Sequence, residues 1–216
     1  PDGTKLLVAN EGELDAVNAA PTVIASDTTI GSVSIISVPA VITGVPTSLP
    51  TATADFTGYD SQSAALSAAG VRIFQGGKPS TDFEPEYFAI SADSTKALVT
   101  LQEANSVATL DLATATFTSV VPLGKKNFAT GRHDFSDRDG LTVAGAATTL
   151  VNPTTGNPVF GLYMPDAVAS YSAAGQTYYI TANEGDDRND FLNPDETTTV
   201  GAASGYTLDP TVFPNA

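Results

Sequence analysis

The fold is decided by residues 87–104, which read YFAISADSTKALVTLQEA. Two apolar runs, Tyr87–Ser91 and Ala97–Leu101, are separated by the polar segment Ala92–Lys96, whose Asp, Ser and Thr residues are typical of a tight turn. Strand-like runs joined by such a turn pair with each other in the antiparallel direction. This stretch therefore predicts a β-hairpin.

The same pattern continues after the hairpin. The chain turns again at Glu103–Ser106 and enters the apolar run Val107–Leu112, and a fourth run follows at Phe117–Val121. Four short antiparallel strands within about 40 residues have the size of one propeller blade. The sequence therefore predicts a four-stranded, blade-like unit in this part of the chain.

The second strand of the hairpin recurs twice elsewhere. LLVANEG at residues 6–12 and YYITANEG at residues 178–185 both match ALVTLQEA at residues 97–104. Each copy is an apolar strand that ends in an amide residue, a glutamate and a small residue, and each follows a tight polar turn. A strand precedes the turn of the third copy at Ala167–Ser172, and the first copy continues in Gly31–Val38.

These repeats predict an all-β chain. We expect a partial β-propeller of four-stranded antiparallel blades, with long loops and one short helix at Asp60–Ala69 that Asp60 or Ser61 could cap and Gly70 could terminate. Residues 1–216 are interpreted as a single propeller region in which about three blade-like units are visible. The poorly periodic segment from residue 123 to residue 161 is expected to carry long loops.

Propellers generally have about four to eight blades, so three units leave the predicted ring incomplete. The sequence begins at Pro1, and its only Met is Met164. We interpret the chain as a fragment or a processed product, and we expect further chain to complete the circle.

The composition argues against several classes of partner. The chain has 216 residues, and 9 Lys and Arg stand against 24 Asp and Glu, for a formal net charge of −15. Such an acidic surface, with no basic stripe, argues against nucleic acid and against docking on anionic lipid. No apolar run approaches the roughly 18–20 residues needed for direct membrane insertion. The chain has no Cys for a disulfide framework or a thiolate site.

Polar side chains at the ends of the repeated hairpins form the candidate site. In a hairpin, the residue before the first strand and the residue after the second lie at the same end, which places Glu86 beside Gln102 and Glu103. If these are the inner strands of successive blades, the corresponding residues of all copies ring one mouth of a central channel. The predicted metal ligands are Asn10, Glu11, Glu86, Gln102, Glu103, Asp166, Asn183 and Glu184.

Carboxylate and amide oxygens gathered at one mouth make a hard-oxygen site, which suits Ca²⁺, with Mg²⁺ as an alternative. Crowded carboxylates raise one another's pKa values, and a bound cation relieves that repulsion. The competing interpretation is that Asn-Glu-Gly is turn chemistry after a strand and that the glutamate is solvated. The stretch Gly76–Ser80 lacks the spacing of a phosphate-binding loop, and we expect neither nucleotide nor haem.

Two acidic loops are weaker candidates. Each contains an arginine, Arg138 in one and Arg188 in the other, and these cations are the best placed to hold a phosphate or carboxylate. The alternative is that each arginine neutralises its neighbouring aspartates in a solvated turn. The single His133 excludes a multi-histidine zinc site and is expected in an exposed loop. The aspartates of the two loops are Asp137, Asp139, Asp186 and Asp187.

Five ordered motifs resemble the choice-of-anchor I propeller family. They are NEGE at 10–13, FEPEY at 83–87, SDRDG at 136–140, YMPD at 163–166 and NEGDDR at 183–188. The turn-plus-strand units also resemble the YVTN-type repeat of surface-protein propellers. The resemblance spans nearly the whole chain and implies an extracellular or cell-surface β-propeller, with the periplasm as an alternative location. Some members of the family are described as alkaline-phosphatase-like.

Two functions are consistent with these observations. The favoured one is a non-catalytic binding or assembly module with an acidic, cation-binding channel mouth. The alternative is a calcium-dependent phosphoester hydrolase that uses the same site, with Arg188 on the phosphate and a metal-activated water, although the sequence offers no distinctive nucleophile. Because unpaired strand edges recruit other strands, the expected partners are a complementary fragment or other subunits of a surface assembly.

Overall fold

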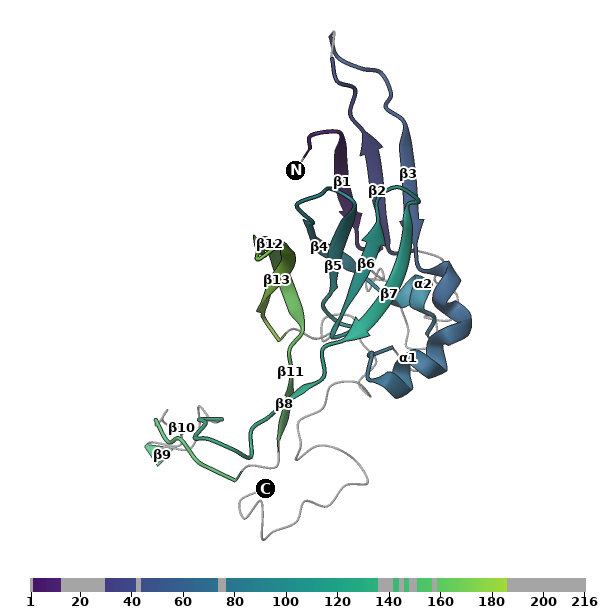
Figure 1. Cartoon of the computed structure of the whole chain (residues 1–216). Helices are drawn as coiled ribbons and strands as arrows, with labels where there is room; N and C mark the ends of the chain where they lie inside the picture. The colour runs from purple at the N-terminus through teal and green to yellow at the C-terminus, as the bar shows by residue number, and fades with distance from the viewer. Residues whose placement is uncertain are drawn as a thin grey trace.

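The computed structural model describes residues 2–12, 30–41, 44–73, 77–135, 142–143, 146–147, 151–156 and 159–185 (Figure 1). Antiparallel β-sheets dominate the described residues, so the predicted β class is confirmed. Three sheets matter for function, and we number them in chain order. Sheet I contains β1 (Lys5–Asn10), β2 (Ser32–Ser37) and β3 (Thr51–Asp55). Sheet II contains β4 (Pro85–Ile90), β5 (Lys96–Leu101), β6 (Ser106–Asp111) and β7 (Thr116–Pro122). Sheet III is the hairpin of β12 (Pro165–Ala173) and β13 (Gln176–Asn183).

Sheet II has the strand order β4-β5-β6-β7, which confirms the predicted run of four antiparallel strands. Its first turn is closed by Asp93, whose Oδ1 accepts hydrogen bonds from Ser91 Oγ at 2.6 Å and from Thr95 N at 3.1 Å. These bonds, the one from Ser91 first, lower the pKa of Asp93 to about 2. Asp2 closes the turn before β1 in the same way, because its Oδ1 accepts from Thr4 N at 2.9 Å. The repeated turn chemistry is therefore a repeated turn structure.

The apolar core lies between sheets I and II. Leu7 and Ile35 of sheet I pack in one cluster with Val99 and Leu110 of sheet II. Phe56, just after β3, is fully buried and closes this core. Its ring stacks on Phe117 at a centroid distance of 4.0 Å and meets Phe83 edge-on at 5.2 Å. Burial of such rings removes large apolar areas from water, which holds the two sheets together.

Sheet III covers the other face of sheet II. β12 lies against β4 and β5, and Figure 1 shows the hairpin beside these strands. Thr100 Oγ1 donates to the backbone oxygen of Asp166 at 2.9 Å, and Ser170 Oγ donates to the backbone oxygen of Ile90 at 2.8 Å. The three sheets therefore form a layered stack in the order I, II, III.

Strand register identifies the corresponding positions of the three sheets. Leu101 pairs with Pro85 at the start of β4, and Asn183 pairs with Pro165 at the start of β12. Asn10 and Leu101 each form the last pair of their strand with the strand that follows, β2 and β6 respectively. Asn10, Leu101 and Asn183 therefore hold the same place in the repeat.

With this correspondence, both contacts between layers join unlike faces. In sheet I, the face that carries Leu7 packs toward sheet II. The residue of sheet II that corresponds to Leu7 is Leu98, which lies on the same face as Thr100, because side chains alternate along a strand. Thr100 contacts sheet III, so the face of Leu98 is the one turned toward sheet III. The opposite face of sheet II, which carries Val99, packs on sheet I. In sheet III, Thr181 pairs with the buried Val168 and lies on the same face, which is turned toward sheet II. Thr181 corresponds to Val99, so sheet III meets sheet II with the face that sheet II turns toward sheet I.

Two short helices lie beside the sheets. The predicted helix over Asp60–Ala69 is confirmed from Ser63 onward, as α1 (Ser63–Ala69), which ends at Gly70 with a left-handed φ of 105°. The preceding residues form the 3-10 helix η2 (Thr57–Gln62), and Asp60 does not cap α1. It accepts hydrogen bonds instead from Ser80 N and Oγ, both at 2.9 Å. No helix of the described residues is long and apolar enough to span a bilayer.

Two further features differ from the sequence expectation. Ser80 belongs to the four-residue helix α2 (Pro79–Asp82), which the sequence did not predict because one helical turn leaves no periodicity. In its described residues, the segment expected to carry long loops also contains four short strands, paired as β8 with β11 and β9 with β10. Their bounds are β8 Lys125–Asn127, β9 Thr142–Val143, β10 Ala146–Ala147 and β11 Phe160–Leu162.

Candidate functional site

Acidic side chains from all three layers meet around Glu86. The pKa of Glu86 is raised from its ordinary 4.5 to about 8, first by burial and then by the negative charges of Glu103, Glu11, Asp166 and Glu84. Glu84 and Glu103 are themselves buried, at 6% and 7% exposure. We call these five residues the acidic cluster. At neutral pH, Glu86 holds a proton that an isolated glutamate would have released.

The strands β4 and β12 have matching shifts in strand register, which lie at two of these acids, Glu86 and Asp166. β4 shifts its register after Pro85, across Glu86, and β12 shifts its register after Pro165, across Asp166. An extra residue in one strand forms a β-bulge, which bends the strand and redirects the side chain at that point. The two acids that the sequence places before their strands therefore lie at equivalent register shifts.

Gln102 lies between the acidic cluster and Glu184. Its side chain is 3% exposed. In one amide orientation Nε2 donates to Glu184 Oε2 at 3.5 Å, and in the reversed orientation the nitrogen donates to both carboxyl oxygens of Glu86, at 2.9 and 3.0 Å. The reversed orientation suits an ionised Glu86, which can only accept. A protonated Glu86 donates its own O–H to the amide oxygen, which leaves the nitrogen for Glu184.

Gly31 lets sheet I approach the start of sheet II. A Cβ at Gly31 would lie 1.9 Å from the backbone oxygen of Phe83, 2.8 Å from Cδ of Pro85 and 2.9 Å from the backbone oxygen of Glu11. Only glycine fits at this distance, since real Cβ atoms do not come within 3.0 Å of such neighbours. The absence of a side chain at Gly31 therefore brings Glu11 next to the segment that carries Glu86.

Asn105 fixes the path of the chain into sheet III. It is 1% exposed and has a φ of 48°. Its Oδ1 accepts hydrogen bonds from the backbone nitrogens of Tyr163 and Met164, both at 3.0 Å, and its Nδ2 donates to the backbone oxygen of Gly124 at 2.9 Å. Because Met164 lies two residues before Asp166, Asn105 sets the position from which that acid enters the cluster.

The strand registers match the residues of the three repeats differently from the sequence at one position. The repeats match Glu103 with Glu11 and Glu184, but Glu11, Gln102 and Glu184 are the residues that directly follow the equivalent positions at the strand ends. Glu103 is an additional acid one residue further along. Sheet II therefore places a neutral amide where sheets I and III place a carboxylate, and this amide is the group that contacts Glu86.

A family model, the choice-of-anchor I domain, matches residues 1–216. The chain belongs to the choice-of-anchor I domain family. Membership in this family suggests a surface-anchored or secreted protein. No curated protein and no solved structure matches this choice-of-anchor I domain.

The predicted ligands Asn10, Gln102, Asn183 and Glu184 are not among the five residues of the acidic cluster. Asn10 Nδ2 donates to Ser34 Oγ at 3.1 Å across to β2, and Asn183 Oδ1 accepts from Thr181 Oγ1 at 3.0 Å. In the part of the domain that the structure describes, no group of three or more Asp, Glu, His or Cys side chains is arranged to hold a metal ion.

The two weaker acidic loops lie outside the described residues. This applies to both arginines and to all four aspartates, which are Arg138, Arg188, Asp137, Asp139, Asp186 and Asp187. The predictions for them stay predictions. His133 is described, and its ring meets Phe128 edge-on at a centroid distance of 4.7 Å, while its Nε2 lies 3.0 Å from the backbone oxygen of Thr130.

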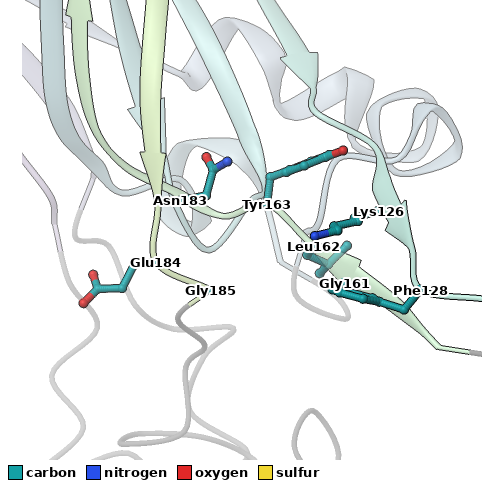
Figure 2. Close-up of a pocket in the computed structure, with 8 residues that line it drawn as sticks. All are labelled: Lys126, Phe128, Gly161, Leu162, Tyr163, Asn183, Glu184 and Gly185. Carbon is teal, nitrogen blue, oxygen red and sulfur yellow. The ribbon is translucent and has the colours of Figure 1, made fainter. Parts of the chain in front are cut away.

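A hollow of about 320 Å³ lies where β8 and β11 meet the end of β13 (Figure 2). Lys126 Nζ lies 4.7 Å from the centre of the Phe128 ring, on its face. Figure 2 shows the Glu184 side chain directed away from these two residues. The residues that line the hollow are Lys126, Phe128, Gly161, Leu162, Tyr163, Asn183, Glu184 and Gly185.

Sequence reasoning missed four residues that build the site. Gly31, Asn105 and Glu84 are described above, and Arg72 donates from Nη1 to the backbone oxygen of Glu103 at 3.1 Å. A usable signal existed for Glu84, because Glu84-Pro85-Glu86 puts a second acid two residues from the first. The other three act through backbone contacts between distant segments, which a single sequence does not reveal.

Proposed function

We propose that this choice-of-anchor I domain is a cell-surface binding or assembly module whose acidic cluster takes up a divalent cation, with Ca²⁺ as the favoured ion. The observation that carries the proposal is the convergence on Glu86 of carboxyls from three sheets, whose negative charges add to the effect of burial and raise its pKa to about 8. A neutral Glu86 relieves part of the repulsion among its neighbours. A divalent cation relieves more of it and displaces the proton.

The donor chemistry favours Ca²⁺ over other ions. Carboxylate and amide oxygens are hard ligands, and Ca²⁺ accepts six to eight of them in an irregular arrangement, whereas Mg²⁺ demands near-octahedral geometry. Because no group of three ligands is in place in the described residues, binding must include the cost of side-chain rotation. We therefore expect a dissociation constant in the range of extracellular modules, about 10⁻⁴ to 10⁻³ M.

We also propose that sheets I, II and III are successive blades of a propeller. Three features support this: the equivalent strand registers, the acids at equivalent bulges, and the unlike faces that meet at both layer contacts. Radial repetition of one blade requires that one face of each blade meet the opposite face of the next. The acidic cluster would then lie at one mouth of the channel.

Calorimetric titration of the domain with CaCl₂ tests the cation proposal. Heat of binding and an upward shift of the melting temperature are expected, since a ligand that binds only the folded state stabilises it. Glu103→Gln should weaken binding by about tenfold, because it removes one carboxylate from the cluster. Asp111→Asn is the matched control, because Asp111 ends β6 far from the cluster and Asn can still accept the turn hydrogen bond from Thr114 N. An absence of binding up to about 10 mM Ca²⁺ would contradict the proposal.

The hydrolase alternative gains no support from the described residues. Arg188, which it places on the phosphate, lies outside them, and no described side chain acts as an evident nucleophile. An assay with a chromogenic phosphate monoester, with Ca²⁺ and with chelator, distinguishes the two functions. Calcium-dependent turnover that is lost in Glu184→Gln would show that the domain is an enzyme and would contradict a purely non-catalytic binding module.

A further inference from the structure

We propose that the open edge of β1 accepts one more antiparallel strand, supplied by an extended polypeptide segment that carries the pattern shared by the starts of β4 and β12. That pattern is a proline followed by an acid and then by a strand, at Pro85–Ile90 in one case and Pro165–Ser170 in the other. The inference rests on strand positions and on a groove, and it does not depend on cation binding.

The first argument is the repeat of strand positions. β5 pairs with β6 on one side and with β4 on the other. β13 pairs with β12 on the corresponding side. β1 holds the place of β5 in sheet I, because Asn10 corresponds to Leu101. In the described part of the chain β1 pairs only with β2, so the position of the preceding strand beside β1 is open.

The second argument is the packing of the next layer. β12 lies against both β4 and β5 of sheet II. One layer earlier, β4 contacts β1 of sheet I, as β12 contacts β5. By the same relation β4 should also lie against a strand that precedes β1 in its sheet. The layered stack therefore provides both an edge for hydrogen bonding and a wall for the side chains of the added strand.

A groove occupies this position. Its volume is about 360 Å³, and it is lined on one side by β1 and on the other by β4. Val8, in the β1 wall, is 40% exposed, and the neighbouring Leu6 is 54% exposed. An extended peptide that adds to a sheet edge gains main-chain hydrogen bonds from the edge and specificity from pockets for alternate side chains. The residues that line the groove are Leu7, Val8, Ala9, Glu86, Tyr87 and Phe88.

The chemistry of the occupant follows from the two strands that already hold this position. Pro85 and Pro165 begin them, and the bulged acids Glu86 and Asp166 come next. A strand of this pattern beside β1 would place one more carboxyl next to Glu11. Proline is tolerated there because the first residue of a strand need not donate to the ladder.

A synthetic peptide tests the proposal directly. It has the sequence of residues 85–91 with Gln in place of Glu86, so that the peptide carries no acidic side chain and neither repulsion from the acidic cluster nor any failure of cation binding affects the result. With the isotope-labelled chain we expect saturable shifts of the backbone amide signals of Leu7, Val8 and Ala9 and a dissociation constant below about 1 mM. A peptide that also carries Pro in place of Phe88 should not bind, since a central proline breaks the ladder.

Matched variants locate the binding site. Val8→Asp should weaken peptide binding by about tenfold or more, because a charged side chain on an edge strand opposes the addition of another strand. Ile180→Asp introduces the same charge at a residue of β13 that is 61% exposed, and it should bind the peptide as the unaltered chain does. Melting curves confirm that both variants are folded.

Three results would overturn the proposal. The first is an absence of shifts at Leu7, Val8 and Ala9 in excess peptide. The second is equal binding by Val8→Asp and the unaltered chain. The third is a dimer, seen by light scattering, that dissociates in Val8→Asp, because this would assign the edge to a second copy of the chain.

Discussion

The side-chain oxygen of Asn105 accepts a hydrogen bond from the backbone nitrogen of Met164 at 3.0 Å, across 59 residues of sequence. This bond joins the turn after β5 to the segment that leads into β12. Met164 has a φ of 46° and is almost fully buried, so its backbone nitrogen has no water to replace Asn105. The position of Asp166 in the cluster thus depends on an amide that is not itself part of the cluster.

Replacement of Asn105 by Ala should therefore be costly. The change removes three hydrogen bonds and leaves the half-buried backbone nitrogen of Tyr163 and the buried one of Met164 without their acceptor. We expect a loss of about 2–4 kcal/mol in the free energy of unfolding, measured by urea denaturation. Asn152→Ala is the matched control, because the Asn152 contact with Asp134 is made by its backbone nitrogen. A loss below about 0.5 kcal/mol in Asn105→Ala would contradict this role.

Glu86 should make stability fall as pH rises. Its pKa is about 8 in the folded chain against 4.5 ordinarily, so between these values the folded state holds a proton that the unfolded state has released. The free energy of unfolding should decline from about pH 4.5 to about pH 8 and then level off. Glu86→Gln removes this decline, and at about pH 8.5 it should be more stable than the unaltered chain by about 2 kcal/mol, after allowance for screening by solvent.

Urea denaturation at several pH values measures this effect. Asp111→Asn is the control, because hydrogen bonds from Thr114 and Ala113 lower the pKa of Asp111 and it does not titrate in the same window. Equal slopes of stability against pH for the unaltered chain and Glu86→Gln would show that Glu86 titrates normally.

Calcium binding should depend on pH in the opposite direction. The cation competes with the proton on Glu86, so the apparent affinity for Ca²⁺ should increase as pH rises toward about 8. Calorimetry in buffers with different ionisation enthalpies should show proton release on binding at pH 7. Binding without proton release at pH 7 would indicate that the cation sits away from Glu86.

Gly31→Ala tests the close approach of sheets I and II. The added methyl would lie 1.9 Å from the backbone oxygen of Phe83, and backbone cannot move aside without a shift of the whole strand. We expect a loss of about 3 kcal/mol in thermal or urea unfolding. Gly58→Ala, where nothing lies within 4 Å of the new Cβ, should change stability by less than about 1 kcal/mol. Similar effects at both positions would contradict the tight contact.

The strands and hairpins could be predicted from the sequence because their signals are local. Asp93 and Asp2 close tight turns within a few residues, and β5 and β6 are short apolar runs between such turns. The convergence of Glu86 with Glu103 followed from the same hairpin, since both lie at one end of it.

What the sequence could not predict depends on single residues and on contacts between layers. The bulges at Glu86 and Asp166 add one residue each, which leaves no pattern. Sheet II has one residue more after β5 than the repeat requires, so Gln102, and not Glu103, corresponds to Glu11 and Glu184. The closeness of Gly31 to Phe83 exists only once sheets I and II are packed.

The unlike faces that meet in the stack give the molecule a direction. Among the described residues, sheet I is one end of the stack and turns Leu6 and Val8 outward, and sheet III is the other end and turns Tyr178 and Ile180 outward. These outward faces correspond to the two unlike faces that meet at both contacts inside the stack. A two-fold symmetric partner would join like faces, so it cannot reproduce that contact. If further sheets repeat that contact, they add head to tail, and the rotation between layers decides whether such a stack closes on itself or runs on as a filament.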